Sequence, residues 1–283
     1  MTATVINSLA FSSLLILVVT GLAIIYGLRG VMNFAHGALY MVGAYLGYTL
    51  SLATDFWVAF VSVPIILALI GIPIEFGVFR PLRNISPTNM ALLTFGGALI
   101  ISDVILSIYG GAPRTAPVPQ LLEGTVDLFG QSYPIYRLFV IAVGFIFSIA
   151  LFLWLRFSRV GMYIRAVSED RQTSAMVGIN ADRIGALVVC LGTGCAGLAG
   201  VLAGPYISVF PAMGQTMVVT ALIIVVLGGV GSIGGAILTA VIYGFVTIIG
   251  TQYAPEIAAV VPYLVAFIIL AVLPRGLGRS RTT

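Results

Sequence analysis

Two polar side chains lie in a segment that is otherwise apolar enough for the interior of a membrane. Asn33 and His36, the only histidine of the chain, belong to the stretch VMNFAHGALYMVGAY. A polar group in hydrocarbon is costly, so it marks a functional site unless a neighbouring helix bonds it. At positions i and i+3 of a helix the two side chains share one face, which Gly37 and Tyr40 extend. We therefore expect either contact with a solute on this face, or bonds to a neighbouring helix that hold the turn after Arg29.

Asp103, within the stretch LIISDVILS, poses the same alternatives. A carboxylate inside a membrane is a functional candidate by default. Because it is close to the end of its apolar segment, it can also extend to the membrane surface or pair with Arg114 or Arg137.

The chain contains few residues of the types that carry out enzyme catalysis. One histidine, no lysine and no cluster of carboxylates leave few groups for acid–base or nucleophilic catalysis. Cys190 and Cys195 stand five residues apart in an apolar run and match no metal-ligand spacing. A Walker A loop needs a lysine for the phosphates, so a nucleotide-hydrolysing subunit of that type is excluded. The sequence predicts no catalytic residue, cofactor or metal site.

Composition indicates where these residues must be positioned. Of the 283 residues, 60% are AVILMFWYC and 8% are charged, and the mean hydropathy is +1.16. Such values are typical of an all-α polytopic membrane protein rather than a soluble domain. The net charge of +4 comes from thirteen arginines against nine acidic residues. In a membrane protein this excess reports topology, and it predicts no nucleic-acid partner.

Apolar stretches of about 20 residues, the length that crosses a bilayer, recur along the whole chain. We expect them to form a single transmembrane domain, 1–283. The stretches are 8–28, 34–52, 57–79, 88–110, 135–156, 184–209, 214–231, 235–252 and 257–274. The first is interpreted as a span and not as a signal peptide, because it lacks a basic leading region. The number of transmembrane helices is eight or nine, since 34–52 follows a tight turn and is the stretch most open to a break.

Arginine positions predict the direction of the spans. If the N-terminus is external, eleven of the thirteen arginines fall on one side of the membrane. These are Arg29, Arg80, Arg83, Arg156, Arg159, Arg165, Arg171, Arg183, Arg275, Arg279 and Arg281. By the positive-inside rule this side is cytoplasmic, and the C-terminus ends on it.

A weak internal similarity predicts a duplication. The stretch NFAHGALYMVGAYLGY (33–48) aligns with GSIGGAILTAVIYGFV (231–246), which matches Gly37 to Gly235 and Ala38 to Ala236. Many transporters are built from two repeated halves of this kind.

Two stretches match G-x-G-x-x-G, GTGCAG (192–197) and GVGSIG (229–234). The motif indicates a dinucleotide site only after a soluble strand, and neither stretch has that setting. We interpret the first as close helix packing within the membrane. The second is interpreted as a flexible turn between spans, with a role in gating or in the solute path as the alternative.

The loop 157–183 is far longer than a turn between spans requires. Ser168 suits a helix N-cap, Glu169 and Asp170 suit the first turn, and Gly178 suits the left-handed position after a helix. These signals predict a cytoplasmic helix of about ten residues over 168–178, with Asn180 capping the next span. Such a helix suits the groove of a partner protein. The alternative is an amphipathic helix on the membrane surface.

Three segments together resemble one family of transport proteins. They are GLAIIYGLRGVMNFAHGALYMVGAY, SRVGMYIRAVSEDRQTSAMVGIN and VLGGVGSIGGA. In order and spacing they are similar to the ABC-importer permeases for branched-chain amino acids, the LivH-type family, along nearly the whole chain. The resemblance implies a multi-pass subunit of the bacterial inner membrane, without its own ATPase motif, that contacts lipid and forms a translocation path.

The resemblance also implies partners and residue roles. The partners would be a second homologous permease in a heterodimer, cytoplasmic ABC ATPases and a periplasmic substrate-binding protein. The coupling residues would be Ser168, Glu169, Asp170, Arg171 and Gly178. The substrate path would include Asn33, His36, Gly37, Tyr40, Asp103 and Thr220. A zwitterionic amino acid needs neutral hydrogen-bond partners along such a path, which Asn33 and His36 would supply or organise.

The chain departs from the family pattern at two places that bear on the substrate. Ala38 stands where relatives often have an acidic residue, and Thr220, Ala221 and Leu222 replace a Lys-Ala-Phe-like run. Branched-chain or other hydrophobic amino acids are the expected substrates, and urea, short amides or other small polar solutes are the alternative. An ion-coupled secondary transporter would need several intramembrane ionisable groups, and only His36, Asp103 and Glu75 qualify.

Overall fold

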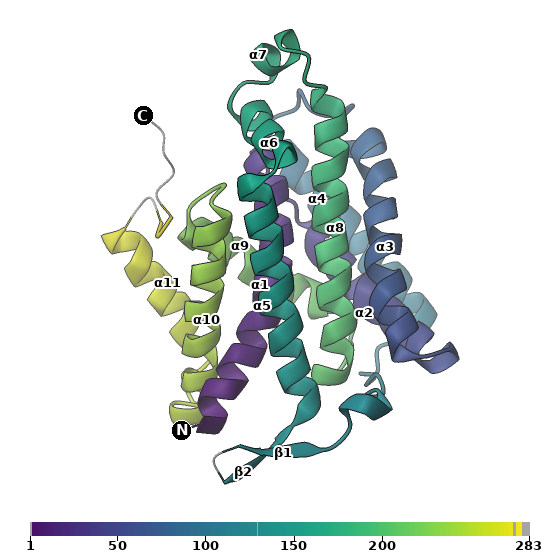
Figure 1. Ribbon diagram of the computed structural model, residues 1–283, viewed down its shortest axis with the longest axis vertical. Coiled ribbons are helices and arrows are strands. Elements are labelled where there is room, and N and C mark those ends of the chain that lie inside the picture. The colour runs from purple at the N-terminus through teal and green to yellow at the C-terminus, as the bar shows by residue number, and fades with distance from the viewer. Residues whose placement is uncertain (1, 129, 274–275, 279–283) are drawn as a thin grey trace.

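The computed structural model describes residues 2–128, 130–273 and 276–278, and its elements are arranged as in Figure 1. The α-helices of these residues are α1 (Thr2–Arg29), α2 (Ala35–Ala53), α3 (Phe56–Ile74), α4 (Pro87–Tyr109), α5 (Ile135–Phe157), α6 (Arg159–Glu169), α7 (Arg171–Met176), α8 (Ala181–Tyr206), α9 (Met213–Gly228), α10 (Ile233–Tyr253) and α11 (Val261–Val272). A π-helical turn, η1 (Glu75–Phe79), continues α3. A 3₁₀ turn, η2 (Gln120–Leu122), and an antiparallel hairpin of β1 (Thr125–Leu128) and β2 (Gln131–Pro134) connect α4 to α5.

Within the described residues each predicted apolar stretch overlaps a helix, which confirms the all-α fold. In the described part of the chain, six helices are long and apolar enough to cross a membrane: α1, α3 with η1, α4, α5, α8 and α10. The helices α9 and α11 are apolar but shorter, and α2, with its histidine, tyrosines and glycines, is not among the six. The open question of a break in 34–52 is answered, because α2 runs continuously from Ala35 to Ala53.

Helices α1 and α8 form the centre of the bundle (Figure 1). Every residue from Ser12 to Ile25 in α1 and from Cys195 to Gly204 in α8 is buried. A helix that is apolar all round can be buried on every side. The small residues of α8 let its neighbours approach closely: a Cβ placed on Gly200 would lie 2.6 Å from the backbone nitrogen of Ala44 in α2. Within GTGCAG, a Cβ on Gly192 would lie 2.8 Å from the backbone oxygen of Gly21 in α1, which confirms the packing interpretation of this stretch.

The end of α3 departs from α-helical geometry. Pro73 lacks the N–H that an α-helix needs at this position, and its ring crowds the preceding turn. The backbone then continues as η1, where the N–H of Arg80 donates to the carbonyl of Glu75 at 2.8 Å. Wider π-turns inside helices often occur at functional sites.

The two ends of the bundle differ in charge. One end carries α6, α7 and the connection between α3 and α4, and the opposite end carries the hairpin (Figure 1). The end with α6 and α7 holds Arg29, Arg80, Arg83, Arg156, Arg159, Arg165, Arg171 and Arg183. Arg114 and Arg137 belong to the hairpin end, whereas Arg275, Arg279 and Arg281 lie outside the described residues.

Candidate functional site

Asn33 and His36 do not share a helix face, so that prediction is wrong. Helix α2 begins at Ala35, and Asn33 precedes it in the turn after Arg29. The side-chain oxygen of Asn33 accepts a hydrogen bond from the backbone N–H of Ala35 at 3.1 Å. Asparagine favours such local bonds at the start of helices over a position within them. With 2% of its surface exposed, Asn33 holds this turn.

His36 is fully buried between α1 and α2. Its Nε2 lies 3.0 Å from the carbonyl oxygen of Val18 in α1. A carbonyl only accepts, so Nε2 carries the proton and the neutral Nδ1 is left as an acceptor. Within the described part of the chain Nδ1 has no hydrogen-bond partner. His36 thus makes the interhelical bond that was one of its two sequence-based interpretations.

Gly37 and Tyr40 belong to the same buried junction. A Cβ on Gly37 would collide with the backbone oxygen of Gly214 in α9 and would lie 2.6 Å from the Cβ of Val218. Only glycine allows the backbones of α2 and α9 to meet this closely. Tyr40 is fully buried. In this conformation His36, Gly37 and Tyr40 fix α2 against its neighbours, and Asn33 holds the turn before it.

Asp103 and Thr220 lie away from that junction. Asp103 is exposed on α4, which packs mainly against α2. The pairs considered for it do not form, because Arg114 Nη2 donates to the carbonyl of Tyr109 at 2.7 Å and Arg137 Nη1 donates to Asn7 Oδ1 at 2.6 Å. Thr220 is partly exposed on α9, where its hydroxyl donates to the carbonyl of Thr216 at 3.1 Å. The fold therefore separates the predicted path residues into a buried group and two exposed positions.

The predicted helix over 168–178 is divided into two at Asp170. Asp170 has extended backbone angles and caps α7, since its carboxylate accepts from the N–H of Gln172 at 2.8 Å and of Thr173 at 3.1 Å. Ser168 is not an N-cap: it lies in the last turn of α6, and its hydroxyl donates to the carbonyl of Arg165 at 2.8 Å. Serine and aspartate both cap helices well, and in this fold Asp170 is the residue at the N-cap position of α7.

The signals that end this segment are confirmed. Gly178 has a φ of +84°. Asn180 caps α8 by accepting from the N–H groups of Asp182 and Arg183 at 3.1 and 3.0 Å. Hydrogen bonds from the hydroxyl and N–H of Thr173 and the N–H of Gln172 lower the pKa of Asp170 below its ordinary value. The tip of the segment is exposed, including Met176 at 85% and Val177 at 72%.

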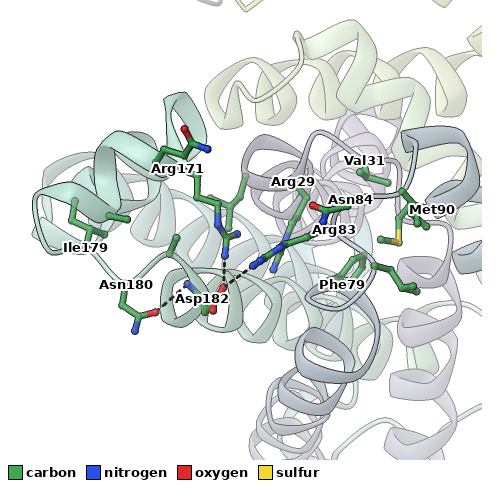
Figure 2. A pocket seen from close by; sticks show the side chains of 16 residues that line it. Arg29, Val31, Phe79, Arg83, Asn84, Met90, Arg171, Ile179, Asn180 and Asp182 are labelled. Carbon is green, nitrogen blue, oxygen red and sulfur yellow. Dashed lines mark hydrogen bonds and ion pairs between the residues drawn. The ribbon is translucent and has the colours of Figure 1, made fainter.

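Behind α7 lies a cavity of about 730 Å³, bounded by the ends of α1, α4 and α8 and by the connection between α3 and α4 (Figure 2). Its charged centre is Asp182 in the first turn of α8. Asp182 pairs with Arg171 of α7, with Arg80 at 2.9 Å and with Arg83 at 3.8 Å. One carboxylate therefore connects α7 to the segment between α3 and α4.

A second ion pair, between Arg29 and Glu75, lies beside this cavity. The Glu75 side chain is fully buried and that of Arg29 is 10% exposed. A Cβ on Gly185 of α8 would lie 2.6 Å from Arg29 Nη2 and 2.7 Å from Glu75 Oε1, so a glycine makes room for the pair. From the sequence, Glu75 is a candidate only for an ion relay. The available signal for the pair is that the first and third predicted spans place an arginine and a glutamate at the same end of the bundle.

Comparison with known proteins gives consistent matches along the chain. A family model described as "Branched-chain amino acid transport system / permease component" matches residues 4–272. The chain is 32% identical to the high-affinity branched-chain amino acid transport system permease protein LivH of Salmonella typhimurium, over 96% of this chain and 94% of that protein. It is 29% identical to the corresponding BraD protein of Pseudomonas aeruginosa, over 97% and 94%.

A solved structure shares the fold. The structure of PsaBC from Streptococcus pneumoniae in complex with Fab matches with a TM-score of 0.51 and 15% identity, over 94% of this chain and 89% of that chain. At this identity the likeness concerns the fold alone.

Proposed function

The chain belongs to the family of branched-chain amino acid transport system permease components. On that premise we propose which parts of the chain contact the ATPase and which form the path of the substrate. It is a multi-pass protein of the bacterial inner membrane and a permease subunit of an ABC importer. The observation that carries this function is the family match over residues 4–272. The substrates we propose are branched-chain or other hydrophobic amino acids.

We propose that residues 1–283 form one transmembrane domain with the end that carries α6 and α7 in the cytoplasm. The concentration of arginines at this end supports the orientation. The hairpin then faces the periplasm, where a substrate-binding protein docks. Nine crossings place the N-terminus outside and the C-terminus inside.

The segment 157–183 is proposed as the contact with the ATPase. Exposed Met176 and Val177 supply apolar surface, and Ser168, Glu169, Asp170, Arg171 and Gly178 surround or support them. A movement of α7 is passed through Arg171 to Asp182, and from there to Arg80 and Arg83. The ATPase would thus act on the connection between α3 and α4.

The translocation path is proposed along exposed faces of α4 and α9, between this chain and a second homologous permease in a heterodimer. Asp103 and Thr220 are the path residues with exposed surface. Asp103 lies toward the hairpin end of α4, where its carboxylate attracts the ammonium group of an entering amino acid. Asn33, His36, Gly37 and Tyr40 organise the path by fixing α2, and Asn33 and His36 hold no substrate in this conformation.

Copurification tests the coupling proposal. The tagged protein is extracted in mild detergent, and the wild type is compared with the double variant Glu169→Arg, Asp170→Arg. A matched control, Glu123→Arg, Asp127→Arg, makes the same charge change at the hairpin end. We expect a nucleotide-binding subunit with the wild type and the control, and its loss from the first variant. Recovery of the chain alone, with uptake that follows an ion gradient, would instead indicate a secondary transporter.

The substrate is tested by uptake of labelled leucine and labelled urea in the same cells. The departures at Ala38 and at Thr220 to Leu222 motivate the second solute. We expect uptake of leucine and none of urea above background. The reverse result would assign the chain to the small polar solutes.

A further inference from the structure

A second hollow, of about 560 Å³, lies at the same end of the bundle as α6 and α7. It is bounded by the last turns of α1 and α5, by α6, and by the glycine-containing turn before α10. Its floor is apolar and includes Ile24, Phe152 and Leu155. The segment 157–183 contributes Gly161, Ile164, Arg165 and Ser168 to its lining, and none of the proposed path residues is among the lining residues.

The charge of this hollow is uncompensated. Arg156 and Arg165 line it, and no aspartate or glutamate is among its lining residues. In the described residues neither arginine forms an ion pair with a carboxylate. The first cavity differs, since Asp182 within it and Glu75 beside it pair with four arginines.

Both arginine groups and a hydroxyl are available at the mouth. Arg165 Nη1 donates to the carbonyl of Leu155 at 2.8 Å and Nη2 donates to the carbonyl of Arg156 at 3.4 Å, which fixes the guanidinium beside the last turn of α5. The remaining N–H groups of this guanidinium have no hydrogen-bond partner in the described residues. The hydroxyl of Ser232 accepts from the N–H of Gly235 at 3.1 Å and keeps its own proton to donate. An anionic oxygen at this position would meet donors from Arg156, Arg165 and Ser232.

The mouth lies at the depth of a membrane surface. Arg156 is in the last turn of α5, one of the helices long enough to cross the membrane. Next to it Trp154 and Phe157 are 42% and 77% exposed. Exposed aromatic and arginine side chains at the end of a span mark the headgroup region of the bilayer. Below this level the outward residues of α5, such as Leu153 and Ile149, are apolar and exposed.

We propose that this hollow binds one anionic phospholipid from the adjacent leaflet. The phosphate lies against Arg156 and Arg165 and accepts from Ser232, and the first part of an acyl chain lies over Ile24 and Phe152. Basic pockets between membrane helices suit such headgroups. The apolar floor favours a lipid over free phosphate, and two guanidinium groups without a carboxylate favour phosphatidylglycerol over a zwitterionic headgroup.

Binding of a soluble short-chain lipid to the purified chain tests the proposal. Dioctanoyl phosphatidylglycerol is titrated and its occupancy is read by native mass spectrometry. The variant Arg156→Gln is compared with Arg159→Gln, which makes the same charge change at an exposed arginine outside the hollow. We expect one lipid per chain for the wild type and for Arg159→Gln, and binding about tenfold weaker for Arg156→Gln, as for the loss of a charged hydrogen bond.

A third variant and two competing ligands test the two alternatives to this proposal. The first alternative is that the hollow binds free phosphate, and the second is that it binds any lipid whatever its headgroup. Gly234→Leu narrows the hollow without changing its charge, because a Cβ at Gly234 lies 3.5 Å from Phe152 Cε2. This variant should also lose the lipid, and it serves if Arg156→Gln does not fold. Displacement of the lipid by inorganic phosphate, equal binding of dioctanoyl phosphatidylcholine, or equal occupancy in Arg156→Gln and Arg159→Gln would overturn the proposal.

Discussion

An acidic residue occurs in the apolar sequence of α4, and another directly follows α3. The two carboxylates, Asp103 and Glu75, have opposite environments in the fold. Glu75, at the end of α3, is fully buried and paired with Arg29. Asp103, in α4, is exposed, and in the described residues it forms no ion pair. Charge in an apolar segment therefore does not by itself indicate a solute site. The burial and the partner of each carboxylate separate a group that is paired within this chain from one that has no ion-pair partner in the described residues and that we propose for the solute path.

The glycines of α2 and α4 repeat the contrast. Gly37 in α2 meets the backbone of α9, whereas a Cβ on Gly96 or Gly97 of α4 would have no atom of this chain within 4 Å. Small residues on a membrane helix favour close approach of a neighbour. In α2 that neighbour belongs to the chain, and in α4 it is expected from the second permease.

The largest expected effect is that of Glu75→Gln on stability. The variant leaves Arg29 as an unpaired buried charge, and breaking a buried pair costs about 3–5 kcal/mol. Asp103→Asn should change the free energy of unfolding by less than about 0.5 kcal/mol, as for an exposed site. Reversible unfolding in detergent micelles measures both. Equal effects of the two variants would contradict the contrast between them, and the double variant Arg29→Gln, Glu75→Gln should recover part of the loss.

A second pair of variants tests the glycines. Gly37→Ala pushes a methyl group against the backbone of Gly214, and overpacking of this kind costs about 1–3 kcal/mol. Gly96→Ala adds the same methyl group in open space and should leave the stability of the isolated chain unchanged. Size-exclusion chromatography after heating reports the folded fraction. A stable Gly37→Ala protein would show that α2 and α9 separate at little cost.

The exposed carboxylate of α4 is expected to affect transport instead. Asp103→Asn should lower leucine uptake about tenfold, as for the loss of one charged hydrogen bond, with unchanged amounts of protein in the membrane. Asp127→Asn, which removes an exposed carboxylate from the hairpin, serves as the control. Normal uptake in Asp103→Asn would remove this residue from the path.

The smallest effect concerns the cap of α7. Hydrogen bonds lower the pKa of Asp170, so its contribution is fully present above the ordinary value of about 3.9 and is lost as the pH falls through the lower folded value. Asp170→Ala should therefore speed hydrogen exchange at Gln172 and Thr173 near neutral pH. Asp170→Asn keeps a capping oxygen and should exchange as the wild type does. Slow exchange in Asp170→Ala would show that α7 is held by other contacts.

Helix positions and helix ends were predictable where one local signal dominates. Apolar length located the long helices, and Gly178 and Asn180 behave as their residue types indicate. The predicted N-cap of this helix, Ser168, is wrong because Ser168 and Asp170 are both good capping residues and stand only two positions apart. The sequence shows that each residue type favours the N-cap position, but which of the two caps α7 depends on where α6 ends.

Pairwise contacts across the bundle were not predictable from one sequence. Asn33 looked like a helical residue because apolar periodicity continues through the turn, whereas it precedes α2 and its side chain holds the turn by accepting from the N–H of Ala35. The pair of Arg29 and Glu75 joins positions far apart in the chain, and its clearest sign, a glycine at position 185, has meaning only once α8 is placed beside it.

The π-helical turn at Glu75–Phe79 allows the residues after it to take either of two rotational positions around the axis of α3. A π-turn holds one residue more than the α-helix that could replace it. If this turn tightened to α-helical geometry, the residues beyond it would rotate by about 100° around the helix axis. Arg80 is the first of them, and it is the residue through which α3 reaches Asp182. A small local rewinding would thus turn this arginine away from α8 without bending the membrane-spanning part of the helix.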